Sequence, residues 1–106
     1  MYEGEFMVNK DCCCQRKTQR NEETKKKLIN RLKRIEGQLR GIEAMIENDV
    51  YCNDILIQSA AVSSAVDGFN QELLSCHIKG CVVDDIKKGN TETVDELVKT
   101  IRKLMR

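Results

Sequence analysis

Aromatic side chains are scarce in this chain of 106 residues, where they make up 4%, and proline and tryptophan are absent. The core must therefore be built from aliphatic side chains, and a chain of this length buries limited apolar area by itself. We expect self-association for that reason. No apolar run approaches the roughly 20 residues that span a bilayer, and the polar start Met1–Glu5 predicts no signal peptide. These absences favour a cytoplasmic protein without a membrane partner.

Sequence signals of catalysis are also missing. There is no glycine-rich phosphate loop and no convincing pair of carboxylates, and the single histidine is better suited to bind metal than to act as a base. We therefore expect neither an enzyme nor a small-molecule substrate. Six cysteines without a secretory signal favour reduced thiols that bind metal or sense redox state over a disulfide scaffold.

The net charge of +1 conceals a strong polarity along the sequence. Residues 10–40 hold eleven basic and four acidic side chains, whereas residues 1–9 carry −2 and residues 41–106 carry −4. A nearly neutral protein with one basic third can bind a polyanion through that third. The charge pattern is equally compatible with a solvated helix face.

Apolar periodicity predicts an all-α fold with three helices. Residues 1–21 show no sustained apolar period and are expected to form a flexible arm before a helical domain of residues 22–106. The first helix, over residues 23–46, carries apolar residues at alternating spacings of four and three. The second, over residues 51–88, is very long and apolar on several sides, which indicates burial on several sides. The third carries its apolar face over residues 94–104.

Turn residues separate the predicted helices. Asn48–Asp49 supply a stop for the first helix, and Gly89–Asn90 supply a stop and an N-cap between the second and third. Gly68 and Gly80 lie inside the second helix without turn residues beside them, so we expect them at most to bend it.

Three side chains on the second helix form the candidate metal site. His77 and Cys81 are four residues apart and so lie on one helix face. At about 100° per residue, Cys52 lies within about 20° of the same stripe. Two thiolates and an imidazole suit Cu(I) and also accept Zn(II) or Ni(II).

Cys52 and His77 cannot meet within one straight helix, because 25 residues at 1.5 Å each separate them by about 38 Å. Two copies that lie antiparallel, stripe against stripe, bring Cys52 of one chain to His77 and Cys81 of the other. Each dimer then holds two equivalent sites, as a self-complementary interface requires.

The remaining cysteines do not join this stripe. Cys76 lies about 100° round the helix from His77, which favours a packed or bystander thiol. The run Cys12–Cys14 could scavenge soft metal or take part in redox chemistry, yet three consecutive residues do not easily converge on one ion. We assign neither a defined role.

The sequence resembles the CsoR/RcnR family of metal-sensitive repressors from about Leu28 to its C-terminus. The resemblance is carried by the segment NRLKRIEGQ at residues 30–38, by YCNDIL at residues 51–56, and by the spacing of Cys52, His77 and Cys81. It implies an all-helical repressor, assembled as a dimer of dimers, that binds operator DNA when free of metal. In the family, Cu(I) is bound by the residues that match Cys52, His77 and Cys81. Tyr51 and Glu92 match positions that orient the ligating histidine.

The resemblance also implies a DNA surface on the first two helices without a helix-turn-helix. Its first part matches Arg31, Lys33 and Arg34, and the run Lys25, Lys26 and Lys27 extends it. Residues 53–78 contain no Lys or Arg, a departure from the family that shifts the expected DNA contacts onto the first helix and the arm.

Alternatives to copper sensing remain open from the sequence. Nickel- and cobalt-sensing relatives recruit a further histidine near the N-terminus, but His77 is the only histidine here, which favours three-coordinate Cu(I). Persulfide-sensing relatives keep the two cysteines and lack the histidine, so redox sensing through Cys52 and Cys81 is the runner-up. A third hypothesis is a metal buffer that never contacts DNA, but the basic residues within 10–40 argue against it.

Overall fold

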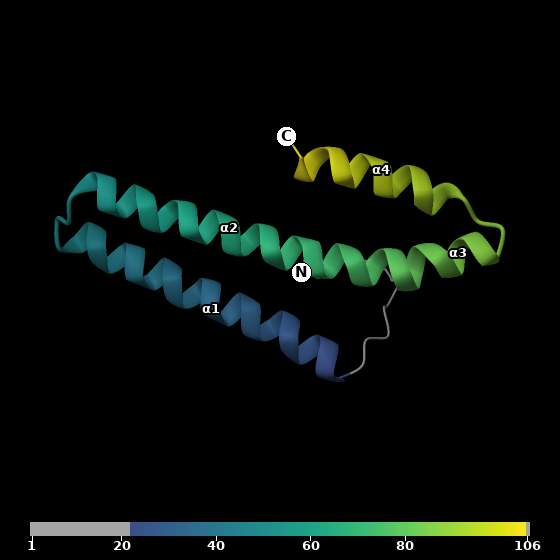
Figure 1. Ribbon diagram of the computed structural model, residues 1–106, viewed down its shortest axis with the longest axis horizontal. Helices are drawn as coiled ribbons and strands as arrows, with labels where there is room; N and C mark the ends of the chain where they lie inside the picture. The colour runs from purple at the N-terminus through teal and green to yellow at the C-terminus, as the bar shows by residue number, and fades with distance from the viewer. Residues whose placement is uncertain (1–21, 106) are drawn as a thin grey trace. The chain divides into compact units, whose positions relative to one another are not determined.

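The computed structural model describes residues 22–105, and all regular secondary structure within that range is helical. The all-α prediction is therefore confirmed, while the predicted arm lies outside the described residues. The elements, labelled in Figure 1, are α1 (Glu22–Glu47), α2 (Cys52–His77), the π-helical turn η1 (Ile78–Val82), α3 (Val83–Lys87) and α4 (Glu92–Leu104).

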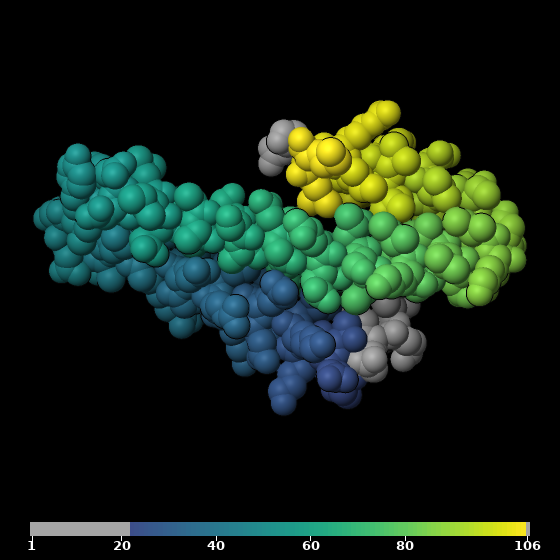
Figure 2. All heavy atoms as spheres, in the orientation of Figure 1, coloured from purple at the N-terminus to yellow at the C-terminus, as the bar shows by residue number. Residues whose placement is uncertain are grey.

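Helix α1 and the N-terminal part of α2 form an antiparallel hairpin within residues 22–73 (Figure 1). Figure 2 shows their side chains in contact along the hairpin. Leu28 and Ile35, seven residues apart on the predicted apolar face of α1, are its buried residues. Leu32 and Leu39 on the same face remain 42% and 48% exposed. The predicted seam is therefore correct in position but only partly covered within one chain.

The end of α1 is fixed by a left-handed residue, in agreement with the predicted stop. Asp49 has φ +54°, and its N–H donates to the Ile46 carbonyl at 3.2 Å while the Val50 N–H donates to the Met45 carbonyl at 3.0 Å. This pair of hydrogen bonds is the Schellman motif, which satisfies carbonyl groups that the helix end would leave unpaired. The Asn48 side chain adds a bond of 2.8 Å to the Ala44 carbonyl.

The long second helix of the sequence prediction is divided into α2, η1 and α3, which follow one another without a non-helical residue. In η1 the hydrogen bonds widen: the Val83 N–H donates to the Ile78 carbonyl, five residues earlier. Gly80 lies inside this turn. Apolar periodicity cannot detect such a turn, because the flanking residues keep helical backbone angles.

The segment from residue 74 to residue 105 forms its own compact unit, in which α4 turns back along α3 (Figure 1). Gly89 has φ +86° and ends α3 with a second Schellman motif, in which the Asn90 N–H donates to the Asp85 carbonyl at 2.9 Å. The Asn90 side chain then accepts a hydrogen bond from the Glu92 N–H at 3.2 Å. The predicted stop is confirmed, whereas the N-cap of α4 is Thr91 and Asn90 precedes it by one residue.

Helix α2 contrasts with this unit because none of its 26 residues is buried within one chain. Leu56 and Ile57 are 65% and 57% exposed, and Tyr51, just before the helix, is 72% exposed. The sequence predicted that this helix is buried on several sides, but the single chain does not bury it in that way. Contiguous apolar surface of this kind marks an interaction site.

The two Schellman motifs predict opposite effects of substitution. Asp49→Gly removes the cost of a left-handed side-chain-bearing residue and should raise the free energy of unfolding by about 1 kcal/mol. Gly89→Ala imposes that cost and should lower it by about 1 kcal/mol, since an added Cβ would meet no atom within 4 Å there. Urea denaturation at fixed protein concentration, followed by circular dichroism, measures both. Changes of the same sign would contradict this account.

Candidate functional site

Cys52 is the first residue of α2, and its thiol is free and exposed. The helix start is set by Tyr51, whose carbonyl accepts hydrogen bonds from the Asp54 N–H at 3.1 Å and the Ile55 N–H at 3.3 Å. The left-handed turn at Asp49 brings the chain to this point. Cys52 therefore lies at the tip of the α1–α2 hairpin with its side chain open to a partner.

His77 and Cys81 lie at the other end of the long helical segment. His77 is the last residue of α2, Cys81 lies in η1, and both are half-buried. Four residues make slightly more than one turn of an α-helix and slightly less than one turn of the wider π-helix, so the two residues share a side of the segment. Single π turns are frequent at functional sites. Cys76 is half-buried with a free thiol.

One chain does not bring the three predicted ligands together. A helix of 26 residues spans about 38 Å between Cys52 and His77. Within residues 22–105, no group of three or more His, Cys, Asp or Glu side chains is placed to hold a metal ion. A site made from these residues requires a second chain.

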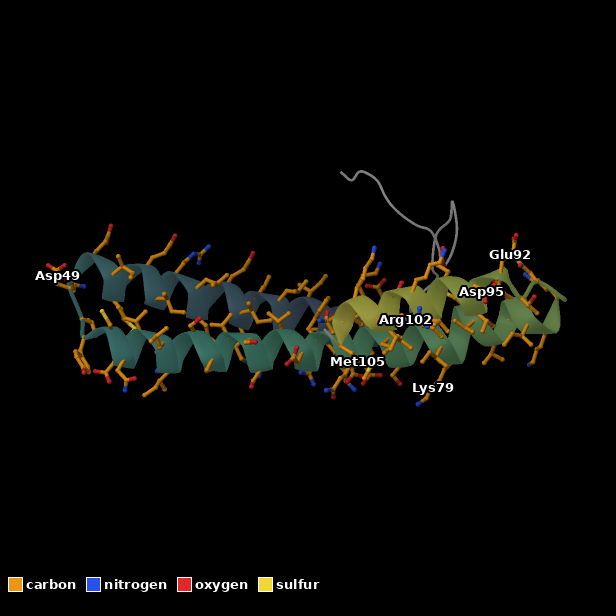
Figure 3. The ribbon with its side chains drawn as sticks, turned by 90° about the horizontal axis from the view of Figure 1, so that it is seen from above. Asp49, Lys79, Glu92, Asp95, Arg102 and Met105 are labelled. Carbon is orange, nitrogen blue, oxygen red and sulfur yellow. The ribbon has the colours of Figure 1, made fainter. Side chains whose placement is uncertain are left out.

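Glu92, predicted to orient the ligating histidine, is the first residue of α4 and is exposed. Figure 3 shows Glu92 and Asp95 at this end of α4, with Arg102 further along it. The bond to Asn90 engages the Glu92 backbone and leaves its carboxylate unused. The roles of Glu92 and Tyr51 at the metal stay predictions.

The basic residues of α1 are arranged in two rows. Lys26, Lys33 and Arg40 follow one another at intervals of seven residues, and Lys27 and Arg34 form a second such row. All five side chains are exposed. Arg40, seven residues after Lys33, extends the first row beyond the predicted DNA-binding residues, and this spacing is visible in the sequence.

Two other predicted DNA-binding residues are engaged in ion pairs. Lys25 Nζ lies 3.6 Å from Glu22 Oε2 one turn away. Arg31 is half-buried, and its Nη2 lies 3.8 Å from Glu72 Oε1 on α2. The charge count along the sequence could not show the Arg31–Glu72 pair, because it joins two helices.

The model of a protein family described as "Metal-sensitive transcriptional repressor" matches residues 24–103, which include nearly all of α1, the hairpin tip and all three candidate ligands. The chain belongs to that family. Its members are transcriptional repressors rather than enzymes, as the sequence predicted. None of the helices described within residues 22–105 combines the length and apolar character needed to cross a membrane.

Relatives of this repressor sense copper. It is 49% identical over 80 residues to the copper-sensing transcriptional repressor CsoR of Bacillus subtilis, an alignment that covers 74% of this chain and 79% of that protein. It also resembles the copper-sensing repressor RicR of Mycobacterium tuberculosis, with 48% identity over 59 residues, 56% of this chain and 62% of that one.

Solved structures agree with the fold. The crystal structure of the copper-sensing repressor CsoR with Cu(I) from Geobacillus thermodenitrificans matches with a TM-score of 0.80 and 37% identity, covering 84% of this chain and 94% of that one. The nickel-responsive regulator InrS matches with a TM-score of 0.66 and 34% identity, covering 83% and 97%.

One interaction beside the candidate ligands was not anticipated from the sequence. Thr93 on α4 is 3% exposed, and its hydroxyl donates a hydrogen bond to the Asp85 carboxylate on α3. Asp85 follows Cys81 by four residues, so this bond fixes α4 close to the segment that carries Cys81. A Thr–Asp pair eight residues apart across a loop has no periodic signature.

We expect Thr93→Val to lower the free energy of unfolding of this repressor by about 1–3 kcal/mol, because the half-buried Asp85 carboxylate loses the hydrogen bond that Thr93 donates. In an Asp85→Ala background the same substitution should be close to neutral. Urea denaturation of the four proteins measures the coupling. Equal losses in both backgrounds would show that the hydrogen bond does not hold α4.

Proposed function

We propose that this chain is a cytoplasmic, Cu(I)-responsive repressor that binds operator DNA when metal-free and releases it when Cu(I) is bound. The observation that carries the proposal is the distribution of the candidate ligands: Cys52 and His77 occupy the two ends of one uninterrupted helix that has no buried residue. An antiparallel partner covers that helix and places its Cys52 beside His77 and Cys81.

The proposed partner is a second copy of this chain, and two such dimers form the repressor. The exposed apolar side chains of α2 support this assembly, since a self-complementary interface covers both copies at once.

The donor set suits Cu(I). Two thiolates and one imidazole are soft ligands, and a single histidine cannot supply a nitrogen-rich site for nickel. Cu(I) held by these residues would join two protomers through one ion. Tyr51 and Glu92 are proposed to orient the His77 ring, as hydrogen-bonded neighbours of metal ligands commonly do.

DNA binding is proposed for the basic rows of α1, through Lys25, Lys26, Lys27, Arg31, Lys33 and Arg34, with Arg40 at the end of one row. The exposed Lys and Arg side chains there are suited to phosphate contacts. By linkage, copper and DNA weaken the binding of each other by the same factor, and such couplings are typically about 1–3 kcal/mol.

Operator binding tests the proposal. A duplex is selected by the metal-free protein from a random pool, and its affinity is measured under reducing conditions with and without Cu(I). We expect Cu(I) to weaken binding by about 5- to 150-fold. His77→Ala should abolish most of this effect, whereas Cys76→Ala, which removes the neighbouring thiol, should leave it unchanged. Equal affinity with and without Cu(I) would reject the copper response, and release by persulfide instead would favour redox sensing.

Mixed dimers test the shared site. Cys52→Ala and Cys81→Ala chains should each lose high-affinity Cu(I) binding, measured against a chelator that strips weakly held metal. When the two chains are refolded together in equal amounts, half of the dimers contain one intact site. Binding should therefore return to about a quarter of the wild-type stoichiometry. No recovery in dimers shown to be mixed would indicate that the ligands come from one chain.

A further inference from the structure

Arg31 differs from the other basic residues of α1 because it faces the neighbouring helix. It lies three residues after Leu28 and four before Ile35, the two buried residues of α1, so its aliphatic stem follows the contact between α1 and α2. Its guanidinium approaches Glu72, with Nη2 3.8 Å from Oε1. Both side chains are partly exposed, at 42% and 46%.

Gly68 gives the guanidinium room to lie across α2. A Cβ atom at this position would lie 3.1 Å from Arg31 Nη1, closer than ordinary van der Waals contact. Gly68 and Glu72 are four residues apart and therefore share one face of α2. On that face, Gly68 leaves space for the Arg31 guanidinium and Glu72 supplies a carboxylate near it.

We propose that Glu72 competes with the DNA backbone for Arg31, so that the intrachain ion pair must open before Arg31 reaches a phosphate. The inference rests on the proposed function, since it takes the basic rows of α1 as the DNA surface. Glu72 attracts the guanidinium across α2 at 3.8 Å, and a phosphate attracts the same cation, so the two anions compete for its position. Glu72 thus lowers the DNA affinity of the metal-free repressor.

The expected effect is modest for one protomer. Partly exposed ion pairs shift an equilibrium by a factor of up to about 5. When two protomers use Arg31 on one operator the factors multiply, which gives up to about 25-fold. Changes of this size are resolved by titration at fixed ionic strength, which must be held constant because phosphate contacts depend on salt.

The experiment compares Glu72→Gln with Asp67→Asn in the full-length, metal-free protein on the selected duplex. Both variants remove one negative charge from α2, but only Glu72 is paired with Arg31, so Asp67 controls for general repulsion of DNA. We expect Glu72→Gln to tighten binding by about 2- to 25-fold and Asp67→Asn by less than about 2-fold. Equal gains from the two variants would overturn the inference.

Two further variants test whether Arg31 transmits the effect. In an Arg31→Gln background, Glu72→Gln should tighten binding no more than Asp67→Asn does. Gly68→Ala should displace the guanidinium by a few tenths of an ångström while Glu72 is kept, which loosens the pair and should tighten binding by less than Glu72→Gln does. The helix stays intact because alanine favours helix. An undiminished effect of Glu72→Gln without Arg31 would overturn the inference.

The inference and the proposed function fail in different ways. Loss of DNA affinity on Arg31→Gln without any gain on Glu72→Gln would refute the competition and keep α1 as the DNA surface. No change on Arg31→Gln, or no DNA binding by the wild type, would refute the proposed DNA surface and the competition with it. A double-mutant cycle tests the ion pair in the absence of DNA. If Arg31 and Glu72 interact, the shift of the urea midpoint in the double variant should differ from the sum of the shifts in the two single variants.

Discussion

The length of α2, together with the apolar surface that it leaves uncovered, is the constraint on which the other features depend. A helix of 26 residues without one fully buried side chain is only partly packed by its own chain, and helices in water are stabilised mainly by packing of their apolar face. The same length keeps Cys52 away from His77. One antiparallel partner meets both requirements, so folding and metal binding are proposed to use a single interface.

The sequence predicted the helices well because their signals are local. Spacings of three and four gave the seam of Leu28 and Ile35, and the stops at Asn48–Asp49 and Gly89–Asn90 correspond to Schellman motifs in the structure. The π turn η1 was missed, since widened hydrogen bonds leave no trace in periodicity. Burial of α2 was predicted from apolar residues on several of its sides, a pattern that cannot tell burial inside a chain from burial between chains.

The candidate site could be predicted only as far as helical geometry reaches. The rise and the rotation per residue of an α-helix were enough to predict that Cys52 and His77 lie at opposite ends of one helix stripe. The pair Thr93–Asp85 and the pair Arg31–Glu72 join different helices, and their geometry depends on how those helices pack. A count of charges along the sequence does not show that Lys25 and Arg31 have acidic partners within the chain.

The basic rows suggest how a site between protomers could control DNA affinity. Contacts from Lys26, Lys33 and Arg40 to phosphates position a protein on DNA but carry no sequence information directly. Under the proposed function, recognition then depends on how the assembly spaces the α1 helices of its protomers against the DNA shape. A ligand bound between protomers biases that spacing without rearranging any single chain. The repressor would thus respond to metal through its quaternary structure, which is where its α2 helices obtain their stability.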